Sequence, residues 1–253
     1  MPLYEIISLI GFILGTILHI VLSILIVQRK QKTRSELVFL FLVISVAMWH
    51  FGNAVSLFSL ILFGKDIPPV SLVADAISYG GIGFMPSLLL NTAVLFLFES
   101  KPHFKKSVQR LIFFGIYLPV LPFSVVIKNF ILSEDTHLMT IASPYVKPFV
   151  VWLIMSLFIA ASISRWIAKT VDEKEERKFH LAIFWAVITI AIFIGFTVIM
   201  EGNKIPYVGD YLVLVSMLSS IFPSIFFPIM CIDTITWSLF SVEAFSTHFS
   251  PSS

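Results

Sequence analysis

Residues Leu37–Gly64 read LVFLFLVISVAMWHFGNAVSLFSLILFG and contain no Asp, Glu, Lys or Arg. An α-helix needs about 20 apolar residues to cross the hydrocarbon core of a bilayer, and this run is long enough. A membrane-spanning β-strand alternates apolar and polar residues and must close into a barrel, but this run shows no such alternation. The stretch therefore predicts a transmembrane helix.

Six further runs without charged side chains indicate that the rest of the chain follows the same plan. They are Ile6–Gln28, Ala76–Phe98, Leu111–Ile127, Pro148–Ser164, Leu181–Met200 and Tyr211–Ile232. The chain is 58% hydrophobic and 13% charged, whereas a soluble domain has about 25% charged residues. We therefore expect an all-α polytopic membrane protein with seven transmembrane helices in residues 1–245. A short polar tail, residues 246–253, follows them.

The charges between these runs predict an orientation. Of the 17 Lys and Arg residues, 13 fall in the connections after the first, third and fifth runs. Basic loops stay on the cytoplasmic side of a membrane, which predicts an outer N-terminus and a cytoplasmic C-terminus. The outer loops are then short: Gly64–Pro69, Lys128–Tyr145 and Glu201–Asp210. The predicted location is a cell membrane that the chain crosses several times.

Several function classes leave signatures that the sequence lacks. The last run has no lysine for a retinal Schiff base, and no His-Glu-x-x-His or P-loop motif occurs. Broken helices are expected at prolines inside the runs, but without the matching second half that many transporters show. The net charge of +2 and the single Cys231 give no sign of a nucleic-acid partner or a cysteine metal cluster. We expect no catalytic residues, no cofactor and no metal. The prolines inside the runs are Pro86, Pro119, Pro122, Pro223 and Pro228.

Four polar residues are the candidates for binding a ligand. Asp75 and Tyr79 share one face of the third predicted helix on its outer side, where they could line an outward-open pocket. The alternative for Asp75 is an interfacial carboxylate that reaches water. Asn91 lies near the inner third of the same helix and is expected to hydrogen-bond across helices. Asn53 lies one turn after Trp49 on the second predicted helix.

Two other features suggest a function less directly. His19 and His50 could ligate a haem only if they lay at one level in the membrane. Counted from Arg29 and Glu36, they lie about 15 Å and about 21 Å deep at the helical rise, which argues against a shared haem. The mixed-charge run Asp172–Lys178 predicts a solvated helical extension, with docking of a cytoplasmic partner as the alternative.

Four loose motifs lie along the chain: Ala47–Ala54, Tyr79–Asn91, Arg110–Ile112 with Tyr117–Pro119, and Phe227–Ile232 followed by Leu239 and Phe240. With them, the stretch between residues 8 and 243 resembles the N-terminal seven-transmembrane sensor region of bacterial histidine kinases. The resemblance implies a sensor in the bacterial cytoplasmic membrane that binds a small or lipophilic signal and relays it to a cytoplasmic signalling protein, with a homodimer left open.

The sequence departs from that family after the last predicted helix. Residues Asp233–Ser238 contain no basic side chain, and no phospho-acceptor helix, ATP-binding domain or cyclase domain follows before Ser253. We therefore expect a sensor module without kinase activity of its own. A small transporter or permease is the main alternative, and a lipid-modifying membrane enzyme is a third.

Overall fold

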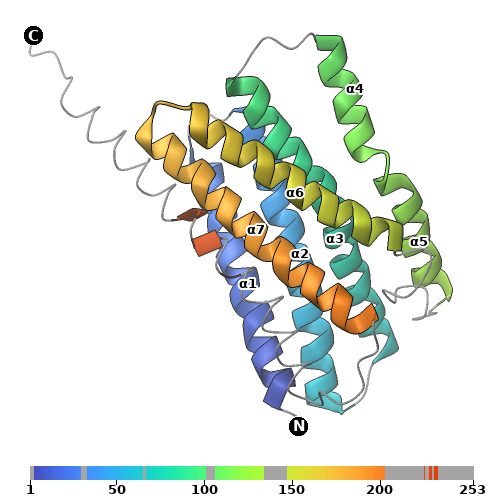
Figure 1. Ribbon diagram of the computed structural model, residues 1–253. Helices are drawn as coiled ribbons and strands as arrows, with labels where there is room; N and C mark the ends of the chain where they lie inside the picture. The colour runs from blue at the N-terminus through green and yellow to red at the C-terminus, as the bar shows by residue number, and fades with distance from the viewer. Residues whose placement is uncertain are drawn as a thin grey trace, which may run out of the picture.

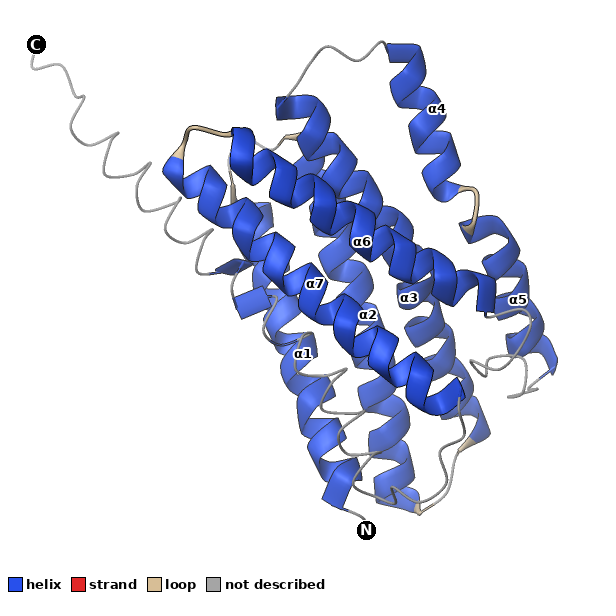
Figure 2. Ribbon diagram, in the orientation of Figure 1, coloured by secondary structure: helices blue, strands red, loops and turns tan. Residues whose placement is uncertain are grey.

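The computed structural model describes residues 3–29, 33–64, 67–100, 106–133 and 147–202, together with residues 225, 228, 229, 231 and 232. Apart from short turns, these residues are helical, and they contain no strand (Figure 2). The expected seventh span, Tyr211–Ile232, lies outside the described residues except for isolated positions, and the tail 246–253 lies outside them entirely. The helices are α1 (Leu3–Gln28), α2 (Arg34–Phe63), α3 (Pro68–Ser100), α4 (Lys106–Tyr117), α5 (Val120–Ser133), α6 (Lys147–Thr170) and α7 (Lys174–Gly202).

The helices are long, apolar and only partly covered by one another. On α1, the side chains of Ile10, Ile17 and Ile24 lie on one face, and each is at least 50% exposed. A water-soluble helix turns its apolar stripe inward, so this outward stripe suits a lipid surface. Among the residues that the structure describes, five segments are long and apolar enough to cross a membrane: Glu5–Gln28, Arg34–Phe63, Pro69–Glu99, Lys106–Asn129 and Lys147–Thr170. These are the features of a multi-pass membrane protein.

The ends of α2 and the break between α4 and α5 follow from local sequence. Thr33 caps α2, since its hydroxyl accepts from the backbone N–H of Glu36 while the Glu36 carboxylate accepts from that of Thr33. Gly64 closes α2 with a φ of 64°, a conformation that glycine adopts without steric cost. The helix stops at Tyr117 and restarts at Val120, because Pro119 has no N–H to continue it. The predicted fourth span is therefore two helices joined end to end.

Two glycines allow α2 and α3 to pack with their backbones in close contact. A Cβ atom at Gly52 would lie 2.4 Å from the carbonyl oxygen of Ala74. A Cβ atom at Gly81 would lie 2.4 Å from the carbonyl oxygen of Ser45. Small residues at helix contacts are typical of membrane bundles, where association depends on close van der Waals packing. The α2–α3 contact is also the most extensive in the described bundle.

The main core lies among α1, α2, α3, α6 and α7. Figure 1 views these helices from the side where α6 and α7 cross the bundle. Leu22 and Ile26 of α1, Val43 of α2 and Val187 of α7 are almost wholly buried in it. A smaller cluster joins α3 to α4 through Phe98 and Ile116. The third helix therefore contacts neighbours on several sides, including α2, α4, α5 and α6.

The three basic connections meet at one end of the bundle. The last turns of α1, α3 and α6 and the first turns of α2, α4 and α7 lie at the end opposite the start of α1 (Figure 1). This arrangement agrees with the alternation of basic and non-basic loops on which the predicted orientation depends. We refer to this end as the basic end.

Candidate functional site

Three of the four predicted site residues lie along one stretch of the α2–α3 contact. The Asn53 amide nitrogen on α2 donates to the carbonyl oxygen of Trp49 at 2.6 Å and to the hydroxyl of Ser78 on α3 at 2.7 Å. Asp75 and Tyr79 lie one helical turn apart beside Ser78, and both side chains are partly buried. We call Asn53, Asp75, Ser78 and Tyr79 the outer polar group.

The fourth predicted residue belongs to a separate contact. The Asn91 amide nitrogen donates to the Tyr117 hydroxyl at 2.7 Å, and the Ser87 hydroxyl donates to the carbonyl oxygen of Ile116 at 2.7 Å. Asn91 lies about 24 Å along α3 from Asp75 at the helical rise. The hydrogen bond that the sequence predicted across helices for Asn91 is therefore present, and it joins α3 to α4. Its Oδ1 atom is buried without a hydrogen-bond partner.

A third polar contact lies between these two, at the closest approach of α2 and α3. The Ser45 hydroxyl donates to the carbonyl oxygen of Gly81 at 2.5 Å, and both residues are buried. Pro86 follows within the same helix and does not interrupt it. Because a proline frees one carbonyl and lacks an N–H, α3 is weakest as a helix near this point. Polar contacts thus fix α3 to its neighbours on both sides of Pro86.

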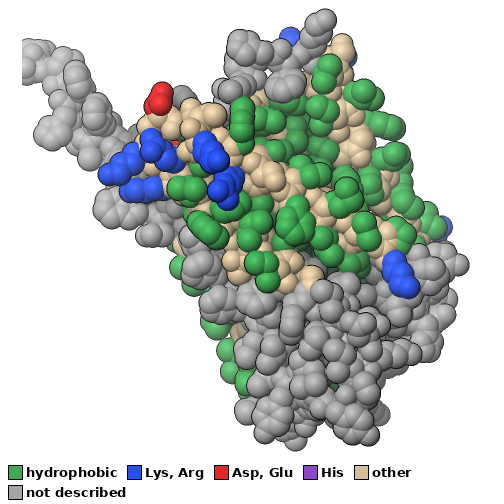
Figure 3. Space-filling view, viewed as in Figure 1, with side chains coloured by type: hydrophobic (Ala, Val, Ile, Leu, Met, Phe, Trp, Pro, Cys, Tyr) green, Lys and Arg blue, Asp and Glu red, His purple; other side chains and the backbone are tan. Residues whose placement is uncertain are grey.

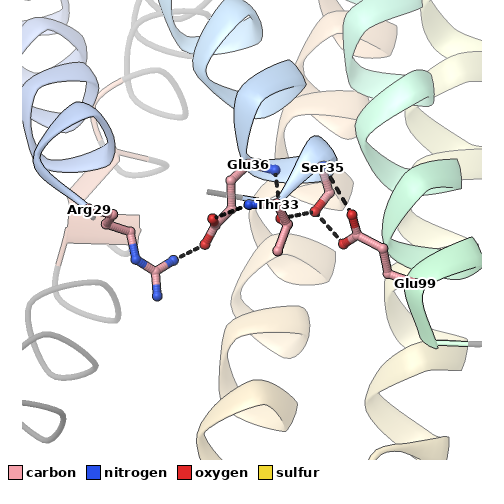
Figure 4. A network of polar contacts seen from close by, with 5 residues as sticks. All are labelled: Arg29, Thr33, Ser35, Glu36 and Glu99. Atoms are coloured by element: carbon pink, nitrogen blue, oxygen red, sulfur yellow. Dashed lines mark hydrogen bonds and ion pairs between the residues drawn. The ribbon is translucent and has the colours of Figure 1, made fainter. Parts of the chain in front are cut away.

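A network at the basic end connects the α1–α2 turn to the end of α3 (Figure 4). Arg29 forms an ion pair with Glu36, whose second oxygen accepts from the Thr33 backbone N–H at 2.9 Å. The Ser35 hydroxyl and backbone N–H both donate to the Glu99 carboxylate, and the Ser35 and Thr33 hydroxyls are 2.8 Å apart. The end of α3 is therefore held to the start of α2 by a charge-assisted contact.

The structure overturns the depth argument for the two histidines. The rings of His19 and His50 are in contact, with centroids 5.4 Å apart. Arg29 and Glu36 served as depth markers, but the long Arg29 side chain reaches Glu36, so their α-carbons need not share a level. The His50 ring also packs against Trp49 and has no hydrogen-bond partner for either buried nitrogen. The His19 ring nitrogen Nδ1 lies 2.7 Å from the Gly15 carbonyl oxygen.

The charged run Asp172–Lys178 is divided between a turn and a helix. Asp172 and Glu173 lie in the turn after α6, and α7 begins at Lys174. Both turn residues, together with Lys174, Arg177 and Lys178, are exposed. The predicted exposure is therefore confirmed at these positions, but the predicted helix begins only at Lys174. No group of three or more His, Cys, Asp or Glu side chains is placed to hold a metal ion among the described residues.

Sequence reasoning missed the hydroxyl and carboxylate partners of these contacts. Ser78 and Ser87 are common residue types in membrane helices and carry no motif, although Ser87 lies one turn before Asn91 on the same face. The sequence held one indication that Glu99 makes a specific contact, namely that it is an acidic residue beside a basic connection. Ser35 follows the Thr33 cap and could have been expected near the turn, but not against α3.

No protein-family model matches the chain, and no curated protein matches it. The resemblance to the sensor region of histidine kinases therefore stays a prediction.

Proposed function

We propose that this chain is a membrane-embedded sensor module that binds a small or lipophilic signal and relays it to a cytoplasmic partner. The observation that carries the proposal is the position of α3. This helix holds Asp75 and Tyr79 in the outer polar group and carries Pro86 in its middle. In its last turn, the Glu99 carboxylate accepts hydrogen bonds from Ser35 in the network at the basic end.

A signal bound at the outer polar group would act by favouring one packing of α3 over another. A ligand shifts such an equilibrium only through different contacts in the two states. Displacing the Asn53–Ser78 hydrogen bond would provide that difference, because it would release α3 from α2 at one point. Movement beyond Pro86 would then reach Glu99 and the α1–α2 turn. The relay in this proposal is therefore a change in how α3 packs, with no chemical step.

The orientation and the number of spans are also part of the proposal. We propose seven spans, with residues 211–232 forming the last, an outer N-terminus and a cytoplasmic basic end. Cysteine accessibility tests this in a Cys231→Ser background. Gly64→Cys should react with a membrane-impermeant maleimide in intact cells, and Lys174→Cys should react only after the cells are opened. The opposite pattern would reverse the orientation.

The proposed ligand site is tested by exchanging a single carboxylate. The full-length protein is purified from membranes in mild detergent, and co-purified small molecules are identified by mass spectrometry and added back to protein in nanodiscs. Asp75→Asn should weaken the affinity for the retained molecule at least about tenfold, since a charged acceptor is lost from a partly buried site. Membrane insertion should be unchanged. Calorimetry measures the affinity.

Glu5→Gln provides the matched control, because it removes a carboxylate from the same end of the bundle on α1. Its affinity should equal that of the original chain. Equal affinities for all three proteins would remove Asp75 from the proposed site. Uptake of the retained molecule into proteoliposomes would instead favour the transporter alternative, because a sensor binds its signal without moving it across the bilayer.

A further inference from the structure

A pocket of about 570 Å³ lies at the basic end, where α6 meets α7. Its basic lining consists of Arg165 and Lys169, one turn apart on α6, and Arg177 on the first turns of α7. Asp172 is the acidic residue among its lining side chains, so the pocket is positively charged. In Figure 3, Lys and Arg side chains gather at this corner of the molecule.

Among the residues that line the pocket, the basic side chains outnumber the acidic Asp172. Within the part of the chain that the structure describes, neither Arg165 nor Lys169 forms an ion pair, and both side chains are exposed. The Arg177 guanidinium donates to the backbone carbonyl oxygen of Asp172 at 3.3 Å, and the Asp172 carboxylate takes no part in that bond. A guanidinium and an ammonium group one turn apart match the oxygens of a phosphate group.

Part of the pocket wall is apolar. Leu181, Phe184 and Trp185 line it, and Trp185 is 59% exposed. These residues follow Arg177 by one to two turns along α7, so the pocket changes from charged to apolar along the helix axis. The guanidinium of Arg165 lies over the Phe184 ring at 5.2 Å, which fixes the cation between the two parts. Tryptophan at such a boundary is typical of the membrane interface.

We propose that this pocket binds the headgroup of an anionic membrane phospholipid, with its phosphate on Arg165 and Lys169 and its acyl chains along Leu181 and Trp185. Charge complementarity and the position of the apolar wall together select this ligand. A free phosphate would use the basic residues but would leave the exposed Trp185 surface uncovered. Basic residues next to a membrane surface attract anionic lipids, and the arrangement here adds an apolar wall beside them. This assignment does not depend on the proposed sensor function.

Native mass spectrometry of the full chain tests the assignment, with phosphatidylglycerol and phosphatidylcholine as probes. Phosphatidylglycerol should bind the original chain more tightly than phosphatidylcholine. The pair Arg165→Gln and Lys169→Gln should lower the affinity for phosphatidylglycerol at least about tenfold. The pair Lys106→Gln and Arg110→Gln on α4 removes the same charge at the same end and should leave that affinity unchanged.

A second variant separates lipid from free phosphate and keeps every charge. Trp185→Ala should weaken the binding of phosphatidylglycerol, and excess sodium phosphate should not displace the lipid from the original chain. Equal losses in the α4 pair and the pocket pair would overturn the proposal, since binding would then follow net charge. Displacement by sodium phosphate, or unchanged lipid binding in Trp185→Ala, would overturn the lipid assignment as well. Thermal unfolding confirms that each variant is folded.

Discussion

Replacing Gly81 with alanine is expected to lower the thermal midpoint of unfolding of the detergent-solubilised protein by about 5–10 °C. The new Cβ atom would lie 2.4 Å from the carbonyl oxygen of Ser45 and 2.7 Å from the backbone nitrogen of Trp49. Backbone atoms cannot rotate away as a side chain can, so α2 and α3 must separate. Overpacking of this kind costs about 1–3 kcal/mol, and the Ser45 hydrogen bond to Gly81 is stretched as well. Circular dichroism during heating measures the midpoint.

The neighbouring Gly80 provides the control for this substitution. A Cβ atom there would meet nothing closer than the Met48 methyl group at 4.0 Å. Alanine is also favoured over glycine inside a helix by about 1 kcal/mol, so Gly80→Ala should raise the midpoint. Both substitutions replace glycine with alanine at adjacent positions, yet they are expected to shift the thermal midpoint in opposite directions. A decrease of the same size in both would show that α2 and α3 are not packed as described.

Replacing Leu22 with alanine is expected to cost about 2 kcal/mol of unfolding free energy. This side chain is 0% exposed and belongs to the main core among α1, α2, α3, α6 and α7. Lipid chains are as apolar as leucine, so little transfer free energy is lost, and the cost comes from the cavity and from missing dispersion contacts. Unfolding of the protein in mixed micelles by increasing amounts of SDS measures the free energy.

Leu14→Ala is the matched comparison on the same helix. Leu14 is 44% exposed on the outward side of α1, where lipid or detergent chains can fill the vacated space. Its replacement should cost less than about 0.5 kcal/mol, because surface substitutions away from packed contacts have small effects. If Leu14→Ala cost as much as Leu22→Ala, the outward face of α1 would be covered by protein and not by lipid.

The helices could be predicted from the sequence because charge-free runs of bilayer length leave few alternatives. Pro119 also marked the position at which the fourth run divides, since it cannot donate a helix hydrogen bond. A membrane helix is predicted from the hydropathy summed over many residues, so a single polar residue within the run does not change the prediction. The bounds were less certain, as α6 extends to Thr170, well beyond the charge-free run that ends at Ser164.

The contacts between helices could not be predicted, because they depend on rotation and register. Gly80 and Gly81 are equivalent in the sequence, yet only Gly81 meets the backbone of α2. Asn53 and Ser78 form a hydrogen bond only because α2 and α3 pack at a particular height. The wrong depth estimate for His19 and His50 had the same origin. It treated Arg29 and Glu36 as if they lay at one level, but the long Arg29 side chain can reach Glu36 from a different level.

The order of the helix contacts has a consequence for how the protein assembles during synthesis. Helix α2 contacts α1, α3 contacts α2, and α7 contacts α6, so two groups can each form from neighbouring stretches of chain. Among the described helices, the most extensive contact between stretches far apart in sequence is the one between α3 and α6. Local contacts form quickly and distant ones slowly, so closure of α6 onto α3 should be the late step in biogenesis. Until then, the small residues Ala160 and Ala161, both buried in the finished bundle, would face lipid or the insertion machinery.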